Sequence, residues 1–98
     1  MYKPWYSDYV RHMLRFYFRY NTPYFKTDVD RNNWNACHDV SVTYSKRDID
    51  VLAVVYGGYD TLSDNVYEAS VTYKVNQNII WGMMDEFERK VACRRGLV

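Results

Sequence analysis

The chain of 98 residues has room for one domain, which we expect to span residues 1–98. Apolar residues make up 48% of the chain and charged residues 26%, a balance typical of soluble folded proteins that excludes disordered and low-complexity classes. The net charge of +1 predicts no partner by itself, and the four glycines and two prolines are too few for a many-stranded sandwich or barrel.

The sequence contains no segment that could cross a membrane. The longest apolar run, Val51 to Tyr56, is far shorter than the ~20 residues that span a bilayer, and no basic-then-apolar leader opens the chain. We therefore expect a cytoplasmic protein with no membrane partner. Because the cytoplasm is reducing, we expect Cys37 and Cys93 to be free thiols. Cys37 and His38 point to different sides of a helix, so we predict a core thiol at Cys37 and no metal site or cofactor.

Charge is distributed unevenly along the chain. Residues 1–26 hold five Lys/Arg against one acid, residues 27–68 hold three against eight acids, and residues 69–98 hold five against three. Two basic ends therefore flank an acidic middle. Either the basic amino-terminal part packs beside the acidic middle within the molecule, or it forms a binding surface. The sequence leaves both interpretations open.

The first predicted helix begins near Pro4 and stops at Asn21-Thr22-Pro23. Its inward residues recur at steps of three and four, and they are Tyr6, Tyr9, Val10, Met13, Leu14, Tyr17 and Phe18. Arg11, Arg15 and Arg19 step by four, so their guanidinium groups leave from one face. The pattern predicts an amphipathic helix with an aromatic core side and a basic rim.

A second helix is expected from Thr27, as its amino-terminal cap, to Tyr44. Its inward stripe consists of Val29, Asn33, Ala36, Cys37 and Val40, with Trp34 beside it. Residues 40–44 alternate and are β-branched, which is also typical of a strand. We favour helix, because no second strand exists with which this segment could pair.

The third and fourth predicted helices each have a cap signal. Ser45 and Asp48 have the spacing of a capping box and begin the third helix, which Gly57-Gly58 ends. Thr61 or Ser63 caps the fourth helix. The inward residues of the two helices are Ile49, Leu52, Ala53, Val55, Tyr56, Val66, Tyr67, Ala69, Ser70 and Tyr73.

The last helix is the longest. A short break at Lys74-Val75 precedes Asn76, an amino-terminal cap, and Gly96 closes the helix. Its inward residues are Ile80, Met83, Met84, Phe87 and Val91. The sequence therefore predicts an all-α domain of about five helices, in which residues 1–44 form aromatic and basic helices and residues 45–98 a helix-turn-helix part.

Residues 61–91 form two predicted helices joined by about three residues, which is the spacing of a helix-turn-helix, although any bundle contains short helix pairs. Gln77 and Asn78 are expected to point outward at the start of the second helix, where a recognition helix presents side chains to base edges. Their amides suit the N6 and N7 positions of adenine.

A wider pattern runs through the carboxy-terminal half. It comprises a charged start at Lys46-Arg47-Asp48-Ile49, an apolar helix ending in glycine, and a stretch from Val66 to Val91 with a basic finish at Arg89-Lys90. Over residues 46–95 this pattern resembles region four of bacterial sigma factors. Lys74-Val75-Asn76 stands at the family's Gly-Val-Ser turn. Because Lys74 replaces the glycine, we expect a left-handed turn there to be strained by roughly a kcal/mol.

The segments Lys3-Pro4-Trp5-Tyr6-Ser7-Asp8-Tyr9-Val10 and Leu14-Arg15-Phe16-Tyr17 resemble short proteins of phages and mobile elements of Gram-positive bacteria. Members of that group are taken for sigma-like transcriptional regulators. The resemblance implies a small phage-type regulator that binds promoter double-stranded DNA, together with host RNA polymerase. Base-edge contacts are expected from Gln77, Asn78 and Trp81, and phosphate contacts from Lys74, Arg89 and Lys90.

The exposed side of the last helix also carries Asp85 and Glu86, which repel phosphates. The missing positive charge has one concentrated source, the stripe Arg11, Arg15 and Arg19. We therefore expect these three arginines to contact DNA on one face, shared with the basic residues of the carboxy-terminal half.

A second hypothesis replaces DNA with a protein partner. The same fold would be a helical inhibitor of a host nucleic-acid machine, either RNA polymerase or a CRISPR-type nuclease, whose nucleic-acid site it mimics or masks. The 11 tyrosines and a half-exposed Trp81 favour a protein interface. No phosphate loop, nucleophile elbow or pair of metal ligands occurs, so we expect no enzyme. Oligomeric state remains open.

Overall fold

The computed structural model describes residues 4–20 and 25–98, and these residues form helices and no strand. This confirms the all-helical prediction. The stop signal Asn21-Thr22-Pro23 and residue Lys3 lie outside the described residues. The five helices are α1 (Ser7–Arg19), α2 (Asp28–Ser41), α3 (Lys46–Gly57), α4 (Leu62–Tyr73) and α5 (Gln77–Arg94).

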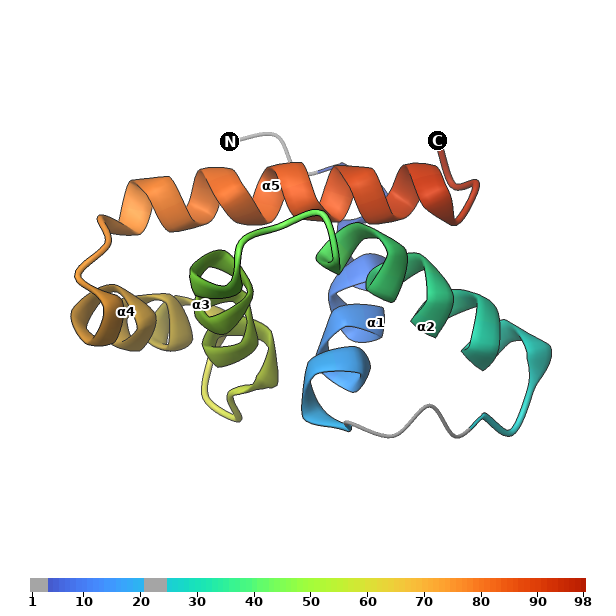
Figure 1. The fold of residues 1–98 in the computed structure, drawn as a ribbon, viewed down its shortest axis with the longest axis horizontal. Coiled ribbons are helices and arrows are strands. Elements are labelled where there is room, and N and C mark those ends of the chain that lie inside the picture. Colours follow the sequence, from blue (N-terminus) through green and yellow to red (C-terminus); the bar gives the residue numbers. More distant parts are fainter. Residues whose placement is uncertain (1–3, 21–24) are drawn as a thin grey trace.

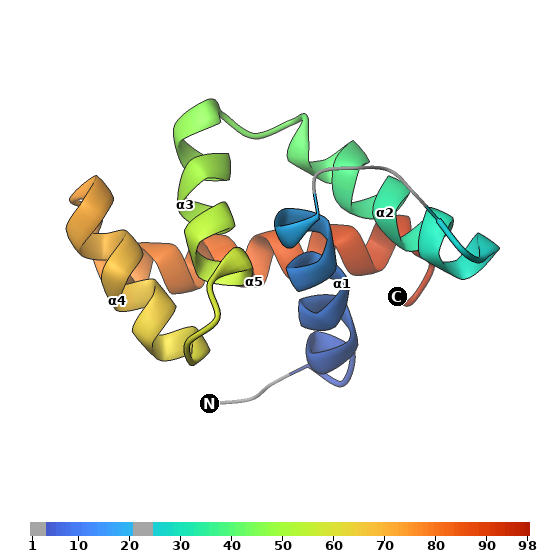
Figure 2. The same cartoon turned by 90° about the horizontal axis from the view of Figure 1, so that it is seen from below.

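The long helix α5 runs along one side of the molecule, and the four shorter helices lie on its other side (Figure 1). Seen from below, α1 and α3 cross α5 near its middle, while α4 and α2 lie toward its two ends (Figure 2). One side of α5 therefore packs on the other four helices, and the opposite side faces outward.

No helix in the described part of the chain has the length and apolar character needed to cross a membrane.

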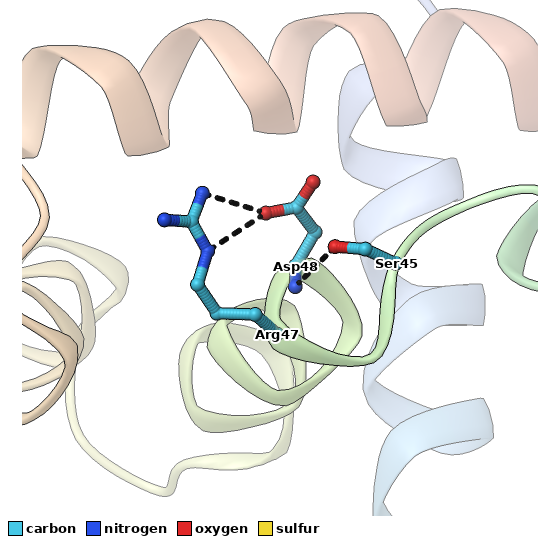
Figure 3. Close-up of polar contacts among 3 residues, drawn as sticks. All are labelled: Ser45, Arg47 and Asp48. Atoms are coloured by element: carbon cyan, nitrogen blue, oxygen red, sulfur yellow. Dashed lines mark hydrogen bonds and ion pairs between the residues drawn. The ribbon is translucent and has the colours of Figure 1, made fainter.

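Four helices begin at caps that the sequence predicts, and three of these caps have the same geometry. The side chains of Thr27, Ser45 and Thr61 each accept a hydrogen bond from the backbone N–H three residues later. At the start of α3, Ser45 Oγ lies 3.2 Å from the amide nitrogen of Asp48, and Arg47 pairs with the Asp48 carboxylate at 3.1 Å (Figure 3). Thr61, and not Ser63, is the cap of α4.

The core contains most of the residues that the periodicity places inward. Those with no exposed surface include Val10, Leu14, Leu52, Val55, Tyr56, Val66, Ala69, Ile80, Met84, Phe87 and Val91. Cys37 is fully buried, as predicted, and burial raises the pKa of its thiol to about 12. The apolar faces of all five helices thus meet in one core.

Three residues predicted to face inward are exposed instead. Tyr9 is 44% exposed, Val29 51% and Tyr67 60%. Val29 lies in the first turn of α2, which projects at the outer end of the molecule (Figure 1). Tyr9 and Tyr67 each adjoin a buried valine, about 100° away around the helix axis, but the buried stripe extends from that valine to the other side, to Leu14 in α1 and to Asn65 in α4. The second helix also ends at Ser41 instead of Tyr44.

An aromatic cluster joins α1 to α2. Trp34 stacks on His38 with ring centroids 4.7 Å apart, and Tyr17 lies 5.5 Å from Trp34. The Tyr17 hydroxyl is 3.1 Å from Nδ1 of His38 and 2.9 Å from Oγ of Ser41. Burial raises the pKa of Tyr17. Part of the tyrosine surplus is therefore used within the fold.

Arg19 closes the carboxyl end of α3. Its guanidinium donates to the carbonyl oxygens of Gly57, at 3.3 Å, and Gly58, at 2.7 Å, and lies 4.1 Å from the Tyr59 ring centroid. A cation at this end also complements the helix dipole. Gly58 has an ordinary extended backbone, but a Cβ there would lie 2.6 Å from Oδ1 of the buried Asn65, so any side chain at this position would have to displace that amide.

A buried carboxylate links three helices. Glu88 of α5 is 2% exposed, accepts a 2.6 Å hydrogen bond from the Tyr56 hydroxyl of α3, and pairs at 2.9 Å with Nε of Arg11 of α1. Burial raises the pKa of Glu88, although the hydrogen bonds from Tyr56 and Arg11 oppose this effect. A buried carboxylate needs such partners, because an unpaired one is strongly destabilising.

We predict that Arg11→Ala lowers the free energy of unfolding by ~3 kcal/mol at neutral pH, because it leaves Glu88 buried without its cation. Urea denaturation followed by circular dichroism measures this change. Arg15→Ala, on the same helix and without an ion pair in the described structure, is the matched control and should cost less than ~0.5 kcal/mol. Equal losses in the two variants would contradict the assigned role of Arg11.

The raised pKa of Glu88 also predicts how stability depends on pH. The folded state holds this proton more tightly than the unfolded state, so the stabilisation is present at low pH. It is lost as the pH rises from the unfolded value of 4.5 through the raised folded value. The free energy of unfolding relative to Glu88→Gln, which does not titrate, should therefore fall over this range and then become flat. A rise instead would show that Arg11 dominates and lowers the pKa.

Candidate nucleic-acid interface

The turn between α4 and α5 comprises residues 74–76 and has a left-handed first residue. Lys74 has φ +54° and is the single non-glycine residue with positive φ among those described. The amide nitrogens of Lys74 and Val75 both donate to the Ser70 carbonyl, and the second bond is typical of a Schellman motif. Lys74 therefore adopts the left-handed backbone conformation that the sequence comparison with the Gly-Val-Ser turn led us to expect.

Asn76 starts α5 as predicted. Its Oδ1 accepts a 2.8 Å hydrogen bond from the Asn78 amide nitrogen, which orients the first turn of the helix. The side chains of Gln77 and Asn78 are exposed there, with Ile79 beside them. The positive end of the helix dipole lies at the same place. The amino end of α5 therefore presents amides and a partial positive charge to a ligand.

A groove lies between the outward side of α5 and the start of α1. Its volume is about 950 Å³. It is lined by Asn78, Trp81, Gly82, Asp85, Glu86 and Arg89 from α5, by Ser7 and Arg11 from α1, and by Pro4 and Tyr6 just before α1. Four of the residues predicted to contact DNA (Asn78, Trp81, Arg89 and Arg11) thus share one groove, together with two carboxylates.

Glu86 and Lys90 are bound to each other and to Tyr44. Glu86 accepts hydrogen bonds from the Tyr44 hydroxyl, at 2.7 Å, and from Nζ of Lys90, at 3.0 Å, and both lower its pKa. Lys90 also lies 5.0 Å from the Tyr44 ring centroid. Lys90 therefore has a carboxylate partner within the molecule, whereas Lys74 and Arg89 have none in the described structure.

The three arginines of α1 have different surroundings. Arg11 is engaged by Glu88 and Arg19 by the end of α3, while Arg15 is half-buried without an ion pair among the described residues. Arg19 therefore lies apart from the groove residues. Arg11 and Arg19 therefore bind within the molecule, which is one of the two interpretations that the sequence left open. Their partners, however, are Glu88 and backbone carbonyls, and not the carboxylates of residues 27–68.

Sequence reasoning missed Glu88 and the groove. A signal for Glu88 was present, because it lies among Met84, Phe87 and Val91 on the inward side of α5. The groove depends on how α1 crosses α5, which no local pattern specifies. Among the described residues, no group of three or more His, Cys, Asp or Glu side chains is placed to hold a metal ion.

We predict that Lys74→Gly raises the free energy of unfolding by ~0.5–1 kcal/mol, because glycine adopts positive φ without strain and only part of the gain is offset by unfolded-state entropy. Urea denaturation tests this. Lys74→Ala removes the same charge but keeps the Cβ, so it should give no gain. A loss of stability in the glycine variant would contradict a strained turn.

Comparisons of the chain with protein-family models, with curated proteins and with solved structures find no match. The function is therefore inferred from the turn, the amino end of α5 and the charges around them.

Proposed function

We propose that the protein is a small transcriptional regulator that binds duplex DNA through the amino end of α5. The observation that carries this proposal is the pair of exposed amides, Gln77 and Asn78, at the start of a helix that follows α4 after a short turn. Recognition helices contact base edges with their first residues. The resemblance to sigma region four supports promoter DNA as the target, with host RNA polymerase as a further partner.

The contacts have distinct roles in this proposal. Gln77 and Asn78 read base edges in the major groove, where amides pair well with adenine. Lys74 and Arg89, both exposed and without carboxylate partners in the described structure, contact phosphates. Lys90 contributes less, because Glu86 already neutralises it. Arg11 and Arg19 serve the fold and are not part of the proposed interface.

The acids on α5 limit how far the helix enters the DNA. Asp85 lies eight residues beyond Gln77, about 12 Å along the axis at 1.5 Å per residue. If only the first turns of α5 enter the major groove, Asp85, Glu86 and Arg89 lie where the helix leaves it, and the Arg89 contact to phosphate offsets part of the repulsion from the two acids. This geometry fits a protein with few phosphate contacts and a shallow dependence of affinity on salt.

A protein-binding module is the second candidate function. The groove favours it, because Trp81 and two carboxylates line a concave surface that suits a polypeptide more than a phosphate backbone. In this case the protein would inhibit a host nucleic-acid machine by occupying its surface. It would show no affinity for duplex DNA near physiological salt.

A salt titration of binding to random duplex DNA separates the two functions. We predict that affinity falls with salt between ~50 and ~200 mM, and that Lys74→Gln and Arg89→Gln each reduce the slope of log K against log[salt] by ~0.9. Gln77→Ala should leave that slope unchanged and weaken binding to a sequence selected from a random pool, because base contacts specify sequence.

Lys26→Gln is the matched charge control, since Lys26 is exposed just before α2 and should not change the slope. Failure of the unmodified protein to bind random duplex DNA at ~50 mM salt would overturn the DNA proposal and favour the protein-binding candidate.

A further inference from the structure

Among the residues that the structure describes, no other helix covers the outward side of α5 (Figure 1). Asn78, Gly82, Asp85 and Arg89 follow one another at steps of three and four, so they form one ridge, and all four are exposed. The start of α1 stands along one side of this ridge and turns the face into the groove described above. The ridge therefore has room for a second element, with α1 as a lateral wall.

Gly82 in the middle of this ridge has no role in the fold. Apart from the backbone of its own helix, no atom of the described residues would lie within 4 Å of a Cβ built at this position, and its backbone is ordinary α-helix. Glycine inside a helix lowers helix stability relative to alanine. The fold gains no close packing and no special backbone conformation in return. An absent side chain on an exposed helix does allow another backbone to approach closely.

The side chains of Asp85 and Arg89 carry opposite charges but do not pair with each other. Neither side chain forms a hydrogen bond or ion pair in the part of the chain that the structure describes, although the two residues are four positions apart on one helix. Their neighbours Glu86 and Lys90, with the same spacing, pair at 3.0 Å. Asp85 and Arg89 lie two residues before and two residues after Phe87. A two-fold axis at the level of Phe87 would therefore bring Asp85 of one copy opposite Arg89 of another.

We propose that a second copy of this chain docks in the groove, with the two α5 helices antiparallel about a two-fold axis near Phe87. Asp85 and Arg89 then form two equivalent ion pairs across the interface. Gly82 faces the interval between Arg89 and Cys93 of the second copy, where its missing side chain lets the helices approach. Trp81 and the start of α1 close the sides of the contact. Such a self-complementary patch is the requirement for a two-fold dimer.

Charge complementarity favours a second copy of this chain over other molecules that could occupy the groove. An all-acidic or all-basic partner would satisfy one of the two charges and oppose the other. The dimer goes beyond the proposed DNA function and does not depend on it. Its test uses no DNA, so failure of one proposal does not refute the other. The two share Arg89, which pairs with Asp85 in the dimer and contacts phosphate in the DNA complex, so one copy cannot make both contacts at the same time.

Sedimentation equilibrium of the full chain tests the dimer. At ~100 µM protein, a concentration that populates dimers with a micromolar Kd, we expect a dimer. Asp85→Arg and Arg89→Asp should each weaken it by at least ~100-fold, because each places two like-charge pairs in the interface. The double variant with both changes restores opposite charges across the axis and should return to within ~10-fold of the original Kd.

Two further variants complete the experiment. Glu68→Arg makes the same charge change on the exposed side of α4 and should leave the dimer intact. Gly82→Leu fills the space at the crossing and should give a monomer that is folded by circular dichroism. A monomeric unmodified protein at ~100 µM, a dimer that survives both single charge reversals, or a double variant that stays monomeric would each overturn the proposal.

Discussion

The buried carboxylate of Glu88 constrains how three of the five helices meet. It can remain in the core only while Tyr56 of α3 and Arg11 of α1 both reach it. Apolar packing alone tolerates a helix that slides or rotates slightly, but a buried charge that loses a partner does not. The position of α1 on α5 is therefore specified by a polar contact. Because the start of α1 is also the wall of the groove, the shape of the outward surface follows from this interaction in the core.

The same interaction determines which basic residues are available to a ligand. A stripe of arginines at helical spacing is usually taken as a single basic surface. Here Arg11 neutralises a buried acid and Arg19 completes the end of α3, so the stripe is divided among structural roles. Lys74 and Arg89, which have no carboxylate partner among the described residues, lie exposed on or next to α5. Any nucleic-acid contact would thus be centred on the amino end of α5, which narrows the proposed interface to one end of one helix.

The sequence predicts where the helices begin and which residues most of them bury, but it does not predict which side chains of different helices contact one another. Caps at Thr27, Ser45 and Asn76 were readable because each is a local interaction between a side chain and the next turn. Tyr9 and Tyr67 were misplaced because the width of a buried stripe depends on the neighbouring helix. The partners of Arg11 and Arg19 are 77 and 38 residues away, beyond the range of any periodicity. The outward position of Gln77 and Asn78 followed from the phase of α5, which the structure bears out.

The three tryptophans can also serve as fluorescence probes of separate parts of the molecule. Its three tryptophans occupy different surroundings: Trp34 is stacked on His38 between α1 and α2, Trp81 lines the groove, and Trp5 is 71% exposed. Indole emission depends on the polarity and quenching groups around each ring. Variants that keep one tryptophan at a time, with phenylalanine at the other two positions, would therefore separate events at the α1–α2 contact from events in the groove. The spectrum of a single small chain can in this way report whether a ligand reaches α5 without disturbing the rest of the bundle.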